Sequence, residues 1–461
     1  MIPKLKDYQR VASDFIKQVN RCGLFLDVGL GKSLTTLTAL VELAQEGQLY
    51  GHVLIIAPKR VAMNTWSDEI EKWSHTRGAR YQILAGLPKK KRETIYDTIP
   101  DAPPTIYIIN REMIPNLVDR FPAEKWQFLN VIVDEAQSFK NYASVGFKKL
   151  KSIAPYTHRM ILLTGTPAPN GLMDIWSLIY LLDGGQRLGP NITAYREAHF
   201  YPGRRTPQGY PYEWHLMEGH DEIIKNKIKD IVIGMEKEDY LDIPPITHNV
   251  IELHMTDKEY EVYRQLRREQ ILPLTDGGTI ESANAAVLSG KLLQLSNGAI
   301  YADEDKSEVI ELHKHKLHAL EEIVDGSGGH PILCFYWFQH DRERLEKHFK
   351  EGVTFDGSNE MLKAWNNKKI PLMFVQPQSA GHGLNFQQGS HIMVFFSIPW
   401  SFELYGQAIG RLHRTGQEEQ VIIHYLKMRG TVEDRIINRL IDKQFNHKDL
   451  MDAIRAEVES I

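Results

Sequence analysis

A glycine-rich turn is the first place where this sequence could do chemistry. Residues 27–33 read DVGLGKS and lie between the apolar run 23–26 and a segment whose apolar residues recur at helical spacing. Gly29 and Gly31 let the backbone approach an anion closely because they carry no Cβ. The first N–H groups of the following helix then point at that anion, with the positive end of the helix dipole behind them. The pattern is typical of a turn that binds phosphate.

Two side chains extend this turn toward nucleotide chemistry. Lys32 supplies a mobile cation for β- and γ-phosphates, and the Ser33 hydroxyl can hold Mg²⁺. Leu26 stands where the longer phosphate-loop pattern has its first glycine, so the chain carries the short form G-x-G-K-S. A glycine turn after a strand can also be no more than a turn. The predicted ATP-binding residues of this segment are Gly29, Leu30, Gly31, Lys32 and Ser33.

A strand that ends on two carboxylates follows later in the chain. Residues 131–137 read VIVDEAQ, and ligands of open α/β folds bind at the carboxyl ends of such strands. Asp134 is suited to Mg²⁺ because a hard cation takes oxygen ligands. Glu135 is placed to orient or deprotonate an attacking water molecule. The alternative is a pair of carboxylates on an exposed strand-to-loop corner.

A second strand ends on small hydroxyl groups. Residues 163–170 read LTGTPAPN, and they follow the acidic strand in the chain. Thr164 and Thr166 could donate hydrogen bonds to the region of Asp134 and Glu135. We predict that they report the phosphate state to the rest of the domain. As a lone motif this segment would be a turn.

Two arginines in the segment 407–417, QAIGRLHRTGQ, could complete a phosphoryl-transfer site. Arg411 and Arg414 are three residues apart, so on a helix they project from one face. A planar guanidinium brought to a γ-phosphate stabilises the charge that builds up during transfer. The alternative is a surface helix that carries two arginines.

The elements that must position these residues fall into two α/β blocks. Short, nearly continuous apolar runs predict buried parallel strands, separated by helical stretches. We predict two tandem α/β lobes, each a doubly wound parallel sheet, with helical insertions. The predicted strands of the first lobe are 23–29, 52–58, 81–86, 105–110, 129–135 and 160–165, and those that follow the first insertion are 249–253, 331–338, 372–377, 391–397 and 421–426.

Domain boundaries follow from breaks in this alternation. Residues 1–245 are predicted to form the N-terminal lobe, with an insertion at about 183–245 in which residues 220–237 are helical. Residues 246–305 give a connecting strand and a helical insertion, in which Thr256 begins a helix with a capping box. Residues 306–461 form the C-terminal lobe.

Composition limits the possible classes of protein. A chain of 461 residues is too long for one core, and its net charge of −4 gives no global attraction to nucleic acid. Any polyanion must therefore be bound in a local groove. No apolar run is long enough to span a membrane, and we expect a cytoplasmic protein that binds no membrane.

Cys22 and Cys334 are predicted to be reduced core residues. His313, His315 and His318 could suggest a metal, but a solvated helix face is the preferred interpretation.

In their order, these motifs resemble those of the helicase superfamily 2 ATPases, and within it the Swi/Snf-type DNA translocases. LKDYQ (5–9) looks like the adenine-reading motif, with Gln9 as the base reader. IIAPKRVAMNTWSDEIEKW (55–73) is similar to the motif after the phosphate loop, and DEAQSFKN (134–141) resembles the DEAH form. SAGHGLNF (379–386) and the 407–417 segment look like the fifth and sixth motifs.

The resemblance implies that both predicted lobes are RecA-like. It also implies Mg-ATP in a cleft and double-stranded DNA bound through its phosphates. It places Gly383 in the ATP site and Gln407 among the coupling residues. The DNA contacts that it implies are sequence-independent and salt-sensitive. These residues are Pro58, Lys59, Asn110, Arg111, Ser379 and Gly381.

The sequence also departs from the family pattern. Gln137 replaces the usual histidine of the second motif, and residues 233–235, Ile-Gly-Met, stand on a predicted helix where the family often has Leu-Arg-Arg. The fifth motif is loose around residues 387–388. The sequence, in which the recognised motifs are those of the ATPase alone, resembles the shorter bacterial, viral and annealing-helicase-like members.

The function expected from the resemblance is an ATP-dependent translocase on duplex DNA that serves replication, repair or recombination. We expect a monomeric motor, and its protein partners are unknown. One alternative is a strand-separating or annealing helicase on DNA or RNA. Another is an ATP-gated nucleic-acid-binding protein with weak hydrolysis. Gln137 and the loose fifth motif suggest it, whereas the intact acidic pair and the two arginines argue against it.

Overall fold

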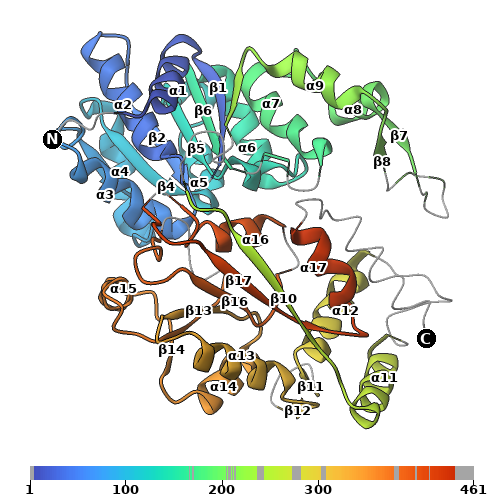
Figure 1. Cartoon of the computed structure of the whole chain (residues 1–461). Coiled ribbons are helices and arrows are strands. Elements are labelled where there is room, and N and C mark those ends of the chain that lie inside the picture. The colour runs from blue at the N-terminus through green and yellow to red at the C-terminus, as the bar shows by residue number, and fades with distance from the viewer. Residues whose placement is uncertain are drawn as a thin grey trace. The chain divides into compact units, whose positions relative to one another are not determined.

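The chain folds into two compact units, Met1–Leu241 and Asp242–Ile461, which we call the first and the second lobe (Figure 1). We describe each lobe by itself, from a computed structural model. The residues that the structure describes are 5–27, 29–165, 167–168, 171–203, 205, 209, 211, 214–235, 243–271, 282–302, 308–377, 384–399, 402–414 and 416–441.

The first lobe is built on a parallel sheet with the strand order β3-β4-β2-β5-β6-β1-β9. Its strands are β1 (Arg21–Leu26), β2 (Val53–Ala57), β3 (Tyr81–Ile83), β4 (Ile106–Asn110), β5 (Asn130–Asp134), β6 (Arg159–Thr164) and β9 (Val232–Met235). Successive residues of β2, such as Leu54 and Ile55, are both buried although their side chains point to opposite faces. Both faces of the sheet are therefore covered, as the near-continuous apolar runs predicted.

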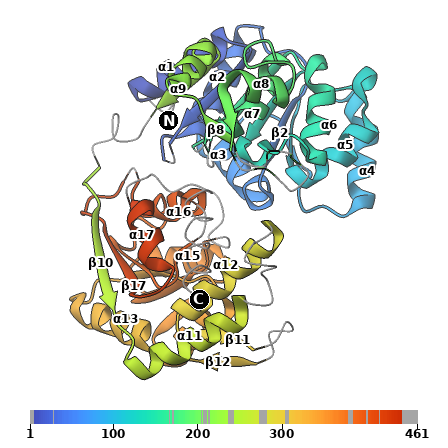
Figure 2. The same cartoon turned by 90° about the vertical axis from the view of Figure 1, so that its right-hand side faces the viewer.

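Helices surround this sheet (Figure 2). They are α1 (Asp7–Gln18), α2 (Lys32–Gln45), α3 (Trp66–Lys72), α4 (Lys89–Thr98), α5 (Ile114–Arg120), α6 (Val145–Ile153), α7 (Ile175–Asp183), α8 (Ile192–His199) and α9 (His220–Ile228). Shorter turns are the π-helix Val61–Thr65 and the 3-10 helices Ile99–Asp101, Arg111–Met113, Ala123–Lys125, Ala136–Phe139, Ala154–Tyr156 and Leu172–Asp174. A two-stranded antiparallel sheet pairs β7 (Phe200–Pro202) with β8 (Trp214–Leu216). Trp176, Leu178, Ile179 and Leu182 of α7 lie in the core.

The region 220–237, predicted to be helical, is only half helix. Helix α9 ends at Ile228, and Val232–Met235 form β9, which pairs in parallel with β1. The residues 233–235 that replace the family's Leu-Arg-Arg are thus in a strand, and the prediction of a helix there was wrong. The free edge of β1 offers backbone hydrogen bonds to this β-branched segment, a long-range effect that helical periodicity does not report.

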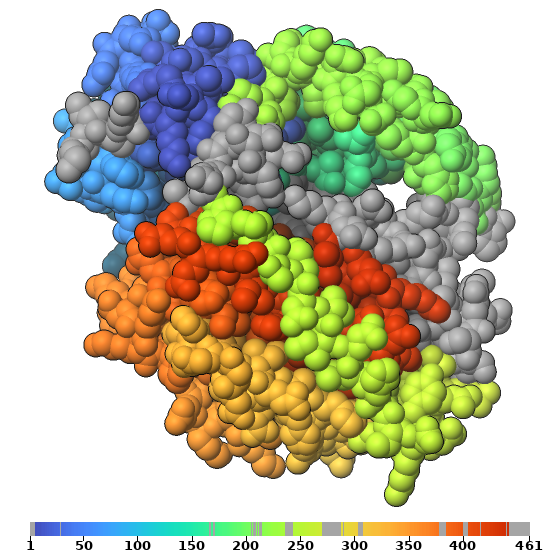
Figure 3. Space-filling view, in the orientation of Figure 1, coloured from blue at the N-terminus to red at the C-terminus, as the bar shows by residue number. Residues whose placement is uncertain are grey.

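The second lobe has its own parallel sheet with the order β10-β17-β16-β13-β15-β14. Its strands are β10 (Thr247–Leu253), β13 (Ile332–Phe335), β14 (Gly352–Thr354), β15 (Leu372–Val375), β16 (Ile392–Phe395) and β17 (Ile422–Met428). β11 (Ala299–Tyr301) and β12 (Val309–Glu311) form a small antiparallel pair. Edge strand β10 lies at the surface of this lobe (Figure 3). Two parallel-sheet lobes confirm the predicted fold class.

The helices of the second lobe are α11 (Asp257–Ile271), α12 (Ser282–Ser296), α13 (His315–Gly326), α14 (Gln339–His348), α15 (Asn359–Asn366), α16 (Phe402–Ile409) and α17 (Glu433–Ile441). Thr256 and Glu259 exchange the hydrogen bonds of the predicted capping box: Glu259 accepts from the Thr256 N–H at 2.8 Å, and Thr256 accepts from the Glu259 N–H at 3.3 Å. None of the helices in the described part of the chain is long and apolar enough to cross a membrane.

Two expectations about single side chains have different outcomes. Cys22 and Cys334 are buried free thiols, as predicted. The histidine run is not a solvated helix face, because His313 is buried and precedes α13, and His315 bonds Glu259 at 2.9 Å. Only His318 of the three is exposed.

Candidate active site

The glycine turn of the first lobe connects β1 directly to α2. Gly29 has φ 97° and Gly31, the N-cap of α2, has φ 80°, both in the region that favours glycine. A Cβ on Gly31 would lie 2.4 Å from Nε2 of Gln9, so a side chain does not fit there. The first N–H groups of α2 have no intrahelical acceptor, which leaves them to face an anion at this turn.

Gln9 lies in the first turns of α1 and is buried against the glycine turn. Its Nε2 donates to the Leu30 carbonyl at 3.1 Å, and its Oε1 accepts from the Lys6 N–H at 3.0 Å. The side chain that was predicted to read adenine therefore also braces the phosphate turn. Both of its contacts lie within the first lobe.

Lys32, the first residue of α2, bends back over the carboxyl end of β1. Its Nζ donates to the carbonyls of Leu26 at 2.7 Å and Asp27 at 3.3 Å. Carbonyl ligands carry only partial charge, so a phosphate that entered the turn would attract this ammonium more strongly. Ser33 follows in the same first turn of the helix.

The acidic pair lies at the carboxyl end of β5, one strand away from β1, since β6 pairs with both. Asp134 is half-buried, and its two oxygens accept from Nε1 of Trp66 and from the Glu135 N–H, each at 3.0 Å. Burial and the charge of Glu135 raise the pKa of Asp134 to about 7, against the opposing effect of Lys32. A carboxylate that lies beside a second one favours a bound cation, so this site fits Mg²⁺.

Glu135 has an unusual backbone. Its φ of 51° and ψ of 53° are left-handed, a conformation that costs a non-glycine residue roughly 1–3 kcal/mol. The strain is held by two hydrogen bonds, because the Glu135 N–H donates to Asp134 and its carbonyl accepts from Ser138.

A hydrogen-bonded chain joins the acidic segment 131–137 to Thr164 of the segment 163–170. The Gln137 Nε2 donates to Glu135 Oε2 at 2.6 Å, and Gln137 Oε1 accepts from the Thr164 hydroxyl at 2.6 Å. Gln137 and Thr164 are both buried. The amide suits this position because it donates at one end and accepts at the other. The sequence marks Gln137 only as a departure from the usual histidine of the DEAH form. Its position two residues after Glu135 was the signal that it could link this acid to the threonines of segment 163–170.

The first-lobe residues predicted to contact DNA lie at the same edge of the sheet. Pro58 and Lys59 follow β2, while Asn110 ends β4, the next strand. Asn110 Nδ2 and Arg111 Nε both donate to Glu112, each at 2.7 Å. Burial raises the pKa of Glu112, but these two hydrogen bonds outweigh it and lower that pKa. Glu112, which is not among the predicted site residues, competes with any phosphate for both side chains.

In the second lobe the two arginines converge, but not on a helix. Helix α16 ends at Ile409, and Arg411 and Arg414 lie in the turns that follow it, so the prediction of a helical face was wrong. Each guanidinium donates through Nη1 to the same Leu384 carbonyl at 3.4 Å. Arg411 is almost fully buried and Arg414 is half-buried. Gly406 lies in the last turn of α16 and Gly410 directly follows it. The low helix propensity of glycine favours an end to the helix before Arg411.

The remaining predicted site residues divide into two groups. Gln407 lies in α16, half-buried. Thr166, Ser379, Gly381 and Gly383 lie outside the described residues.

A strand, glycine turn and helix beside a strand that ends in two carboxylates define the first lobe as that of a nucleotide-hydrolysing enzyme of the phosphate-loop class. The chain belongs to the SNF2-related family: the SNF2-related domain matches residues 9–297, and the helicase conserved C-terminal domain matches residues 315–416. The predicted resemblance and the predicted enzyme class, a DNA-dependent ATPase that uses ATP, are thereby confirmed.

Two relatives and one solved structure illustrate the likeness. Protein p41 of Acyrthosiphon pisum secondary endosymbiont phage 1 is 34% identical over 98% of both chains. An uncharacterized ATP-dependent helicase of Mycoplasma pneumoniae is 26% identical over 96% of this chain, which spans only 42% of that helicase. The Sulfolobus solfataricus SWI2/SNF2 ATPase core in complex with dsDNA is 20% identical, with a TM-score of 0.45, over 98% of this chain and 93% of that one.

Proposed function

We propose that this chain couples the hydrolysis of Mg-ATP to movement along duplex DNA. The observation that supports this most directly is the hydrogen-bonded set Asp134, Glu135, Gln137 and Thr164 at the carboxyl edge of one sheet. Lys32 lies at the same edge, and its charge lowers the pKa of Asp134. That edge continues without a break to the strand ends of β2 and β4, where DNA contacts are predicted. Nucleotide and DNA would then act on neighbouring loops of one rigid sheet.

The proposed roles follow from the chemistry of each side chain. The backbone of Gly29, Leu30 and Gly31 would hold the phosphates, and Lys32 would leave the β1 carbonyls to bind them. Ser33 and Asp134 would hold Mg²⁺, which supplies charge neutralisation for the transferred phosphoryl group. Glu135 would orient the attacking water and accept its proton.

Coupling would use the chain from Glu135 through Gln137 to Thr164. A change in the hydrogen bonding of Glu135 on hydrolysis would alter the donor that Gln137 offers and so reach β6 through Thr164. Thr166 and Gln407 are proposed to extend this link. Arg411 and Arg414 are proposed to stabilise charge during transfer.

DNA would be held through its phosphates by residues of both lobes. Pro58, Lys59, Asn110 and Arg111 are the proposed contacts of the first lobe, and Ser379 and Gly381 those of the second. We propose a role in replication, repair or recombination, and a monomeric motor. A strand-separating helicase remains the second candidate on the family assignment.

The rate of ATP hydrolysis measured with and without nucleic acid tests the proposal. We expect duplex DNA to stimulate turnover at least about tenfold, because DNA-bound conformations complete the site, and RNA to stimulate it much less. A triplex-displacement assay then separates the two candidates, since a translocase displaces a third strand without opening the duplex. Turnover that no nucleic acid changes would instead support the ATP-gated binding protein.

Replacing Arg111 should weaken DNA binding without affecting the ATP site. Arg111→Ala removes one exposed cation, so we expect the slope of log affinity against log salt to fall by about 1, equally for all sequences. Fluorescence anisotropy with duplexes of different sequence measures this. Arg120→Ala is the matched control, an exposed arginine of the same lobe that pairs with Asp97 at 2.6 Å. An unchanged slope for Arg111→Ala would remove this residue from the interface.

A further inference from the structure

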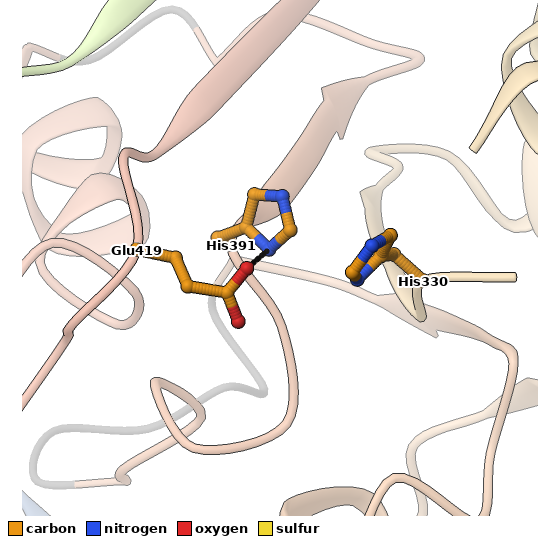
Figure 4. A group of neighbouring side chains, drawn as sticks. All are labelled: His330, His391 and Glu419. Atoms are coloured by element: carbon orange, nitrogen blue, oxygen red, sulfur yellow. Dashed lines mark ion pairs between the residues drawn. The ribbon is translucent and has the colours of Figure 1, made fainter. Parts of the chain in front are cut away.

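Three side chains with metal-ligating atoms meet in the second lobe (Figure 4). They are His330, His391 and Glu419. One ligand atom from each lies within 4.8 Å of those of the other two. Figure 4 shows the His391 ring between the Glu419 carboxylate and the His330 ring. The family resemblance assigns no role to any of them.

The topology of the sheet explains why these residues meet. His330 precedes β13, His391 directly precedes β16 and Glu419 precedes β17, and these three strands are neighbours in the order β17-β16-β13. Ile332, Ile392 and Ile422 are in register across them. All three side chains therefore lie at the amino edge of one parallel sheet, on rigid strand ends.

Buried Gln417 fixes the backbone beneath two of the ligands. Its Nε2 donates to the Ser390 carbonyl at 2.9 Å, directly before His391, and its Oε1 accepts from the Glu419 N–H at 3.0 Å. The Ser390 hydroxyl in turn donates to the Pro331 carbonyl, next to His330. A hydrogen-bonded frame thus ties together the three segments that carry the ligands.

The contacts within the group suit a borderline metal ion. His391 Nδ1 lies 3.0 Å from Glu419 Oε2, and the rings of His330 and His391 meet edge to face with centroids 4.9 Å apart. Two imidazoles and one carboxylate are ligands that Zn²⁺ accepts, with a fourth position left for water. Bonds of about 2.0–2.2 Å would require the ligand atoms to approach by at most about 1.5 Å. His330 can supply this movement because it is exposed and follows two glycines.

A cation already lies beside the Glu419 carboxylate. Lys368 is the competing cation, since its Nζ lies 3.7 Å from the other Glu419 oxygen.

We propose that His330, His391 and Glu419 form a Zn²⁺ site that fastens the amino ends of β13, β16 and β17. The ion takes one imidazole nitrogen from each histidine and one carboxylate oxygen. It stabilises the second lobe, and it does so independently of nucleotide and DNA.

Metal titration of the full chain without a histidine tag tests this site. After treatment with EDTA, and with Mg²⁺ present, calorimetry with ZnCl₂ should show one tight site per chain, and Co²⁺ should give the visible absorption of a tetrahedral complex. At a hundredfold excess of Zn²⁺ over Kd, the Tm should rise by about 5–10 °C.

Variants of exposed residues distinguish the site from general binding to surface histidines. His330→Ala and Glu419→Gln should each weaken Zn²⁺ binding about tenfold or more and abolish the Co²⁺ spectrum. His158→Ala, which removes an exposed histidine of the first lobe whose Nε2 lies 3.4 Å from Nδ2 of Asn20, should leave both unchanged.

Lys368 provides a test in the opposite direction. Lys368 has φ 57°, which asparagine tolerates, so Lys368→Asn removes the competing ammonium without new strain. Zn²⁺ binding should become severalfold tighter. Equal Zn²⁺ affinity in the wild type, His330→Ala and Glu419→Gln would overturn the proposal, as would a Lys368→Asn variant that binds Zn²⁺ more weakly.

Discussion

Glu135→Gln should abolish most ATP hydrolysis while ATP binding persists. We expect turnover to fall by about 10²–10⁴-fold, the usual contribution of a positioned general base. Glutamine has the same shape, and its carbonyl oxygen can still accept the Gln137 hydrogen bond, so the fold and the link to Thr164 should survive. Single-turnover hydrolysis, with binding of a fluorescent ATP analogue measured in parallel, separates the two effects.

The charge of Glu135 gives this variant a second, opposite effect. That charge raises the pKa of Asp134, so its removal lowers the pKa and favours the carboxylate that Mg²⁺ needs. Mg-ATP should therefore bind Glu135→Gln at least as tightly as it binds the wild type. Lys32→Ala is the contrasting control, since it should lose binding and hydrolysis together. Wild-type turnover in Glu135→Gln would show that another group activates the water.

The buried strands were the most predictable part of the fold. The acidic strand, predicted at 129–135, is Asn130–Asp134, and the run predicted at 52–58 is Val53–Ala57. A strand with both faces covered needs a continuous apolar run, and such a run bounded by turn residues has few other structures available. The same local signal marked Asp134 as the end of its strand.

Edge strands and turns were less predictable because they depend on distant partners. Val232–Met235 are a strand only because β1 presents a free edge, and residues 220–228 just before them are truly helical. Arg411 and Arg414 were expected to share a helix face. They converge instead because both reach the Leu384 carbonyl, a contact across a large separation in sequence.

The same limit applies to the side-chain networks. Motif spacing could place Asp134 and Glu135 at a sheet edge, but not the amide orientation by which Gln137 joins Glu135 to Thr164. His330 and His391 have no common motif, and only the strand order β16-β13 brings them together. Local patterns report what neighbours in sequence do, whereas strand order decides which distant residues meet.

Replacing Arg411, in the second lobe, should lower ATP turnover by as much as replacing Glu135 in the first lobe. We expect Arg411→Ala to lower turnover by about 10³–10⁵-fold with ATP affinity changed only severalfold, as for arginines that stabilise transferred charge. Arg411→Lys should lose nearly as much, because an ammonium keeps the charge without the planar fork. Arg414→Ala, at a half-buried position, should also be strongly impaired.

The control must separate chemistry from stability, because Arg411 is almost fully buried. Thermal unfolding of each variant shows whether the second lobe remains folded, and Arg411→Lys preserves most of the buried volume. Arg429→Ala is the matched control, an exposed arginine of the same lobe that pairs with Glu252 and Asp434. If folded Arg411→Lys and Arg414→Ala both hydrolyse ATP at the Arg429→Ala rate, the second lobe contributes no guanidinium to hydrolysis. The proposed coupling of that lobe to the phosphate would then fail, because neither of the two arginines would supply the charge on which it depends.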